Sequence, residues 1–221
     1  MPGRSTALRR LVPRALRGNR RERRSAETRE RLYRAALQLF AERGYPATTV
    51  EDITEAADVG KGTFFNYFPT KEHVLARYGA ERIQAVERAR REALRGERAV
   101  LEVLGELAGD LAGQSSERPA LLRAIYAAHA SCDAVRAELR KRLMRGRELL
   151  ADIYRAGQRR GEVRRDLSAS ELSRLTQIVF LGVTLSWSMN PDTPSRKTAA
   201  MVWELLCPSL RAAAKRASRG L

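Results

Sequence analysis

The stretch that decides the fold reads TTVEDITEAADVGKGTFFNYFPTK and runs from Thr48 to Lys71. Its first helix can begin at either of the two threonines, because an acidic residue stands three positions after each of them and can close a capping box. Val50, Ile53 and Ala57 then fall on one helical face over two turns. These residues predict a short helix with one buried side.

A second short helix is predicted from about Lys61 to Phe68, after a tight corner at Asp58-Val59-Gly60. Aspartate and glycine both tolerate the left-handed backbone that such a corner needs. Phe64 and Phe68 are spaced i, i+4 and can face inward together, which turns the polar residues outward. Two short helices joined by a tight turn are the helix-turn-helix plan, whose second helix reads the major groove of DNA.

The segment from Leu32 to Leu75 resembles the DNA-binding domain of the TetR (tetracycline-repressor-like) family, through the pieces AALQLFAERGYPATTVEDITEAA and GKGTFFNYFPTKEHVL. Three positions depart from the family pattern. Asp58 stands where glycine is common, Gly60 stands where serine often caps the recognition helix, and Phe65 replaces a frequent tyrosine. The resemblance implies an all-α protein, with an N-terminal three-helix helix-turn-helix DNA-binding domain and a larger C-terminal helical ligand-binding and dimerisation domain.

The chain of 221 residues is expected to have three parts. Residues 1–24 carry nine arginines against one glutamate, with two prolines and two glycines, and are predicted to form a disordered basic arm. Such an arm can follow DNA phosphates or enter a minor groove, or it can be a solvated tail. Residues 25–71 are expected to be the helix-turn-helix domain, and residues 72–221 the ligand-binding and dimerisation domain.

The first ordered helix is predicted over Ser25–Arg43, because its apolar residues recur on one face and Gly44 follows as a stop signal. A loop is predicted at residues 113–116. Ser168 and Glu171 have the spacing of a second capping box, at the start of a helix in the second domain. From Glu97 onward the chain reads helical.

The formal net charge of +16, from 42 basic and 26 acidic residues, draws the protein to polyanions with a strong salt dependence. Apolar runs stay well short of the ~20 residues that a membrane helix needs. The basic start of the chain also lacks the apolar stretch of a secretory signal. A cytoplasmic protein without a membrane partner is therefore expected.

Groups that could support catalysis or metal binding are scarce. Cys132 and Cys207 are far apart and lack CxxC spacing, so both are interpreted as small buried residues rather than redox groups. His73 and His129 have no carboxylates at ligand spacing. The sequence contains no Ser/His/Asp or Cys/His arrangement and no cofactor fingerprint, so it predicts a protein that is not an enzyme and uses no cofactor or metal.

The segment from Leu172 to Trp187 is apolar on more than one face and must be buried on two sides. The last helix, from about Arg196 to Leu206, adds further apolar residues. The resemblance implies that these two helices pair with their copies in a second subunit, and a plain monomer core is the alternative. The expected interface residues are Phe180, Trp187, Trp203 and Leu206.

Two groups of residues are expected to contact double-stranded DNA. The phosphate contacts are assigned to Thr48, Thr49, Thr63, Tyr67 and Lys71. Lys61, Gly62, Phe65 and Asn66 are expected nearest the base edges. Asparagine suits adenine, lysine suits guanine, and a phenylalanine ring can contact a thymine methyl group.

A pocket for a hydrophobic small-molecule effector is expected in the second domain, although most of the same residues also describe an ordinary helical core. Its expected lining residues are Tyr126, His129, Tyr154, Gln177, Phe180 and Thr184.

The sequence thus predicts a sequence-specific transcriptional regulator, most simply a repressor, that binds a palindromic operator as a homodimer and is released by an effector. The alternative is a non-specific architectural DNA-binding protein without an effector. The positive net charge supports this alternative. The long helical second domain argues against it, because coating DNA does not require such a domain.

Overall fold

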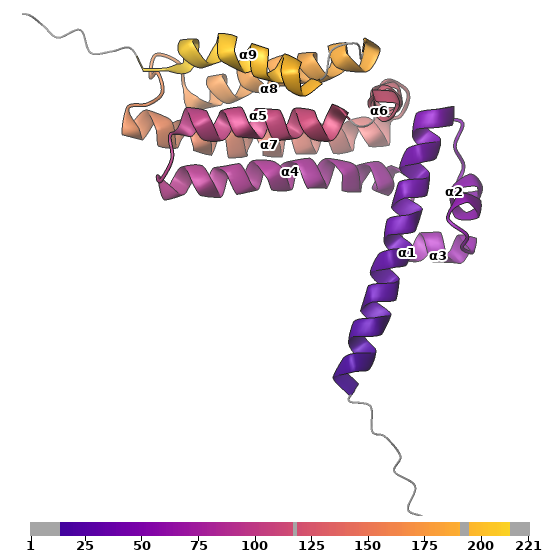
Figure 1. Cartoon of the computed structure of the whole chain (residues 1–221). Coiled ribbons are helices and arrows are strands. Elements are labelled where there is room, and N and C mark those ends of the chain that lie inside the picture. The colour runs from indigo at the N-terminus through magenta and orange to yellow at the C-terminus, as the bar shows by residue number, and fades with distance from the viewer. Residues whose placement is uncertain (1–13, 117–118, 191–194, 213–221) are drawn as a thin grey trace, which may run out of the picture.

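The computed structural model describes residues 14–116, 119–190 and 195–212, which form nine α-helices (Figure 1). The first three helices make a small head, and the other six form a bundle beside it. The helices are α1 (Arg14–Arg43), α2 (Val50–Ala56), α3 (Lys61–Tyr67), α4 (Glu72–Arg95), α5 (Val100–Ser116), α6 (Pro119–Ser131), α7 (Asp133–Arg160), α8 (Ala169–Met189) and α9 (Ser195–Leu210).

The head is built around the inner faces of its three helices. Thr49 caps α2, and its hydroxyl accepts from the Asp52 backbone N–H while the Asp52 carboxylate accepts from the Thr49 N–H, so the predicted capping box is present. Phe40, Phe64 and Phe68 meet in the core of the head and are almost fully buried. Because α2 and α3 have seven residues each, their stability depends on this core rather than on intrinsic helicity.

The apolar core of the head does not stop at the end of α3. It continues over the first turns of α4 and onto α6, where Leu121, Ala124 and Ala128 are buried in the same cluster. A second cluster fills the bundle between α4, α5, α7 and α8. In Figure 1, α4, α5 and α7 run side by side, α8 and α9 lie together along the far side, and α6 stands at the end of the bundle beside α1. The proposed division between residues 71 and 72 stays a prediction.

The structure differs from the expected basic arm at residues 14–24, which are helical and continue α1 without a break. Arginine and glutamate both favour helices, and Arg23 lies 3.4 Å from Glu27 one turn later. Gly18 is the one glycine in the extension, and a glycine inside a helix costs only about 1 kcal/mol. The prediction from charge and composition therefore placed the start of this helix too late, at Ser25 instead of Arg14. Residues 1–13 lie outside the described part of the chain.

The boundaries predicted for α2, α3 and α9 agree with the structure to within a few residues. The loop expected at residues 113–116 is the last turn of α5. The Ser168–Glu171 capping box is present at the start of α8. Within the described ranges, the helices are all too short or too polar to cross a membrane.

Candidate DNA-binding surface and effector cavities

The corner between α2 and α3 fixes the direction of the second helix. Asp58 has a φ of 50°, the left-handed conformation that glycine adopts most easily and that aspartate tolerates. Gly60 then occupies the N-cap of α3 without a side-chain cap. The corner therefore keeps the predicted helix-turn-helix geometry although both positions depart from the family pattern.

The two faces of α3 have different environments. Phe64 is buried, and its ring lies 5.7 Å from that of Phe68. Phe65 is 47% exposed, although its ring edge contacts Phe64. Lys61, Gly62 and Asn66 are exposed, while Thr63 and Tyr67 are half-buried. The residues expected at base edges thus share the outward side of α3.

Two of the residues expected to contact DNA hold partners within the head. The Lys61 ammonium pairs with the carboxylate of Glu51 on α2, and the hydrogen bond from Lys61 holds the pKa of that carboxyl below its usual value. The Tyr67 hydroxyl lies 3.0 Å from the Ser25 hydroxyl on α1. Lys61 must release Glu51 before it can reach a guanine, and because the pair is exposed, breaking it costs little.

Two of the predicted phosphate contacts are placed differently from expectation. Thr48 is fully buried, and its hydroxyl donates to the Gly44 carbonyl, so its side chain faces the head core and not the DNA side. The Lys71 ammonium donates to the carbonyls of Tyr45 and Thr48 at 2.9 and 2.8 Å and lies over the Tyr45 ring. The sequence predicted a phosphate contact for Lys71 but could not show that the preceding loop folds back over this side chain. Lys71 therefore fastens this loop to the start of α4.

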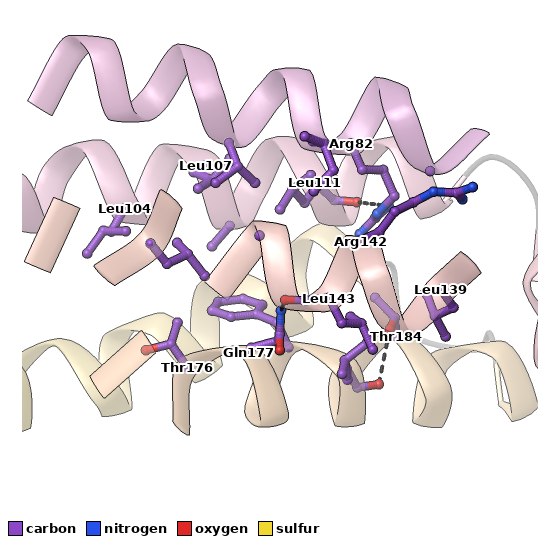
Figure 2. Close-up of a pocket in the computed structure, with 18 residues that line it drawn as sticks. Arg82, Leu104, Leu107, Leu111, Leu139, Arg142, Leu143, Thr176, Gln177 and Thr184 are labelled. Carbon is purple, nitrogen blue, oxygen red and sulfur yellow. Dashed lines mark hydrogen bonds between the residues drawn. The ribbon is translucent and has the colours of Figure 1, made fainter. Parts of the chain in front are cut away.

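A first cavity, with a volume of about 190 Å³, lies in the bundle between α4, α5, α7 and α8 (Figure 2). Figure 2 shows Leu104 and Thr176 toward one end, and Arg82, Arg142 and Thr184 toward the other. The predicted lining residues Gln177, Phe180 and Thr184 all border this cavity. The lining is mostly apolar, with leucine as its most frequent residue, and the two cations Arg82 and Arg142 lie toward the end opposite Leu104.

A second cavity, with a volume of about 120 Å³, adjoins the first and lies between α4, α6, α7 and α8. The predicted residues Tyr126 and His129 line it, and Thr184 borders both cavities. Burial lowers the pKa of His129, so its imidazole is neutral at pH 7. Its Nδ1 lies 2.6 Å from the Ile125 carbonyl and must carry the proton, whereas its buried Nε2 has no partner among the described atoms. Nε2 is thus an acceptor for a hydrogen bond from a ligand.

Tyr154 borders neither cavity, which corrects its predicted role. It is fully buried, its hydroxyl lies 2.6 Å from the Thr176 hydroxyl, and burial raises its pKa to about 12. Its place in the core follows from packing between α7 and α8, which the sequence does not specify.

The two arginines shared by both cavities were missed by sequence reasoning. Arg82 donates to the Leu111 carbonyl at 3.2 Å. Arg142 crosses α4 where Gly79 has no side chain and donates to the Leu75 carbonyl at 3.1 Å and to Glu138 at 2.9 Å. A signal was present in the spacing, because each arginine falls seven residues after a buried apolar residue, Leu75 or Val135, and so on an inward stripe.

The predicted dimer residues face the inside of their own chain. Trp187 is 6% exposed, Phe180 borders the first cavity, and Trp203 packs against Gly105 of α5. Leu206 is half-buried. Because the Leu172–Trp187 helix is apolar nearly all round, the sequence did not show which side faces out. The large apolar residues that α8 and α9 expose form what we call the α8–α9 face. They are Leu175, Ile178, Leu185, Met189, Met201 and Leu205.

The model of the bacterial regulatory proteins of the tetR family matches residues 32–78, and the model of the C-terminal domain of TetR/AcrR family transcriptional repressors matches residues 80–211. The chain belongs to the TetR family. The first match holds the helix-turn-helix. The second holds the α8–α9 face and most residues that line the two cavities.

Individual TetR relatives agree with this assignment. The regulator TcmR of Streptomyces glaucescens is 50% identical over 54 residues, which is 24% of each chain, so this chain matches about a quarter of that relative's length. The repressor KstR of Mycobacterium tuberculosis is 26% identical over 162 residues, 73% of this chain and 71% of KstR. The crystal structure of Thermus thermophilus FadR, a TetR family repressor in complex with lauroyl-CoA, is 30% identical, covers 87% of this chain and 100% of that one, and superposes with a TM-score of 0.61.

Proposed function

We propose that this TetR protein is a transcriptional repressor that binds a palindromic operator as a homodimer and leaves DNA when an effector binds in its bundle. The observation that carries the proposal is that α3 has one buried aromatic side and one exposed side with polar and aromatic residues. Phe64 and Phe68 anchor it from below, while Lys61, Phe65 and Asn66 project together from the other side. An exposed Phe beside Lys and Asn on an anchored short helix suits the major groove.

The α8–α9 face is the proposed contact between the two copies. Residues 175–189 contain no charged side chain, and Leu175, Ile178, Leu185 and Met189 recur along one exposed stripe of α8. On α9, Leu205 is 80% exposed and Met201 lies one turn away. Exposed apolar stripes of this kind are typical of a protein interface, and a twofold pair would present two α3 helices to two half-sites.

The effector is proposed to be an amphiphile with an apolar chain and an anionic or strongly polar head. The end of the first cavity near Leu104 would take the chain, and Arg82 and Arg142 at the shared wall would meet the head. The complex of T. thermophilus FadR with lauroyl-CoA supports this class, because that ligand joins an apolar chain to a phosphorylated group.

The coupling between effector and DNA is proposed to run through the start of α4. Arg142 borders both cavities and bonds the Leu75 carbonyl, Tyr45 of the head donates to Glu72, and Lys71 bonds two carbonyls of the head. An effector that draws Arg142 toward its own head group would therefore act on the helix to which the head is fastened. Release of DNA requires only that effector and operator favour different positions of α4.

The proposal is tested by selecting duplexes from a random DNA library with the purified protein and footprinting the recovered sequence. We expect a protected palindrome whose half-sites lie about one helical turn, or a multiple of it, apart. Uniform coverage without a preferred sequence, lost at moderate salt, would instead establish the architectural alternative.

Asn66→Ala is expected to relax the base preference at one position in each half-site. A bidentate amide–adenine contact contributes roughly 1–3 kcal/mol of discrimination, so the preference there should fall by about 5- to 150-fold. Affinity for a panel of single-base operator variants measures this. Gln38→Ala is the matched control, because it removes an exposed amide from α1. An unchanged preference profile would remove Asn66 from base reading.

Ala108→Phe is expected to weaken effector binding by at least about ten-fold while leaving operator binding intact. Ala108 is buried and lines the first cavity, so the added ring fills space that a ligand needs. Titration with lauroyl-CoA, followed by calorimetry and by release of labelled operator, measures both properties. Gly109→Phe is the control, because Gly109 faces open space. Equal ligand affinity in Ala108→Phe and wild type would place the effector elsewhere.

A further inference from the structure

Helix α1 continues well beyond the head. The Ser25 hydroxyl lies 3.0 Å from that of Tyr67, the last residue of α3, and the α1 backbone extends from Ser25 back to Arg14. At 1.5 Å per residue, these eleven positions add about 16 Å of helix beyond the contact. Figure 1 shows this end of α1 projecting past α3 and away from the bundle.

The described side chains of this extension are strongly cationic. Arg20, Arg21, Arg23 and Arg24 are all exposed, and Glu22 is the one acid among them. Arg23 lies 3.4 Å from Glu27, in an exposed ion pair of the kind that contributes at most about 1 kcal/mol and is screened by salt. A polyanion could therefore displace Glu27 at little cost.

Apolar packing does not account for the position of residues 20–25. They read RRERRS, so this part of the extension has no apolar side chain to bury against the head or to insert into a membrane surface. The extension starts from the contact with Tyr67, at the end of the proposed recognition helix. The polyanion that must lie nearest to it during function is the DNA that α3 reads.

We propose that residues 20–24 of α1 form a second DNA-binding element that contacts the phosphates flanking the base pairs read by α3. The proposal rests on the proposed function and adds a footprint outside the operator core. The arginines would neutralise backbone phosphates and release counterions, which strengthens binding without adding sequence preference. The element is a helix that extends the head, so its reach is fixed by the fold rather than by a flexible tail.

The test compares R20Q/R21Q/R24Q with wild type on the selected operator, as a core duplex and as a duplex lengthened by about ten base pairs on each side. Glutamine keeps the helix propensity while removing the charge. R88Q/R91Q/R95Q is the matched control, because these three arginines are exposed on α4 and removing them changes the net charge equally. Fluorescence anisotropy over a salt series gives the affinity and its salt slope, and circular dichroism checks the helix content.

Wild type is expected to bind the longer duplex more tightly, and the α1 variant to lose that advantage. Each lost phosphate contact should lower the salt slope by about 0.9, so three arginines give roughly 2–3 units per protomer and about 10- to 100-fold weaker binding at 50 mM salt. The α4 variant should behave as wild type. Equal slopes and affinities for the α1 variant and wild type would overturn the proposal. The proposal would also be overturned if the α1 variant kept wild-type DNA binding but no longer bound phosphatidylglycerol vesicles, because the extension would then be a membrane contact. If wild type selects no operator, the proposed function itself fails.

Discussion

Phe64→Ala is expected to abolish operator binding while leaving the effector bundle folded. Phe64 is fully buried in the head, and its ring lies 5.5 Å from that of Phe65 and 5.7 Å from that of Phe68. Truncating such a ring to a methyl group costs about 3–5 kcal/mol, through lost burial and the cavity that remains. Helix α3 has seven residues and cannot hold its shape without this anchor.

The measurement combines operator affinity with thermal unfolding followed by circular dichroism. We expect operator binding to fall at least about 100-fold and the head to unfold before the bundle does. Phe65→Ala is the matched control, because it removes the same ring from the neighbouring exposed position. That variant should keep the thermal stability of wild type and lose only contacts with DNA. If Phe64→Ala bound the operator with wild-type affinity, α3 would not be the DNA-reading helix.

Ile178→Arg is expected to convert the proposed dimer into a monomer and thereby to weaken operator binding. Ile178 is 55% exposed at the centre of the apolar stripe on α8. Both subunits contribute the same residues to a twofold interface. The substitution therefore buries two unpaired arginines, each at a cost of about 3–5 kcal/mol. A monomer presents one α3 and loses the second half-site.

Sedimentation equilibrium at micromolar concentration measures the change in mass, and the same samples are titrated with operator. The control is Met144→Arg, because Met144 is an apolar residue of α7 that is 56% exposed outside the α8–α9 face. We expect this control to remain dimeric. A dimer that survived Ile178→Arg would move the subunit contact to another surface, and a wild-type monomer would contradict the proposed assembly.

The parts of this molecule that the sequence predicted are those decided by neighbouring residues. The Thr49–Asp52 capping box and the spacing of Phe64 and Phe68 define α2 and α3 within a few residues of chain, so their location and their buried side were predicted correctly. The same holds for the Ser168–Glu171 capping box of α8.

The parts that the sequence missed depend on contacts between distant elements. A helix that is apolar nearly all round has no preferred side of its own, and packing against α6, α7 and α9 decided that Trp187 faces in and Ile178 faces out. Likewise, the direction of the Lys71 ammonium depends on a loop more than twenty residues earlier. The position of Arg142 depends on the space left by Gly79 on another helix.

The apolar core of the head is completed by Leu121, Ala124 and Ala128 of α6, which lie far along the chain from α1–α3. An excised fragment that ends at Lys71 would expose the surface those side chains cover, and it should aggregate rather than fold. The same holds for a chimaera in which the head of one repressor is joined to the bundle of another. Re-engineering the DNA specificity of this protein therefore calls for substitutions on the outer side of α3, or for a graft that carries a matching α6 surface.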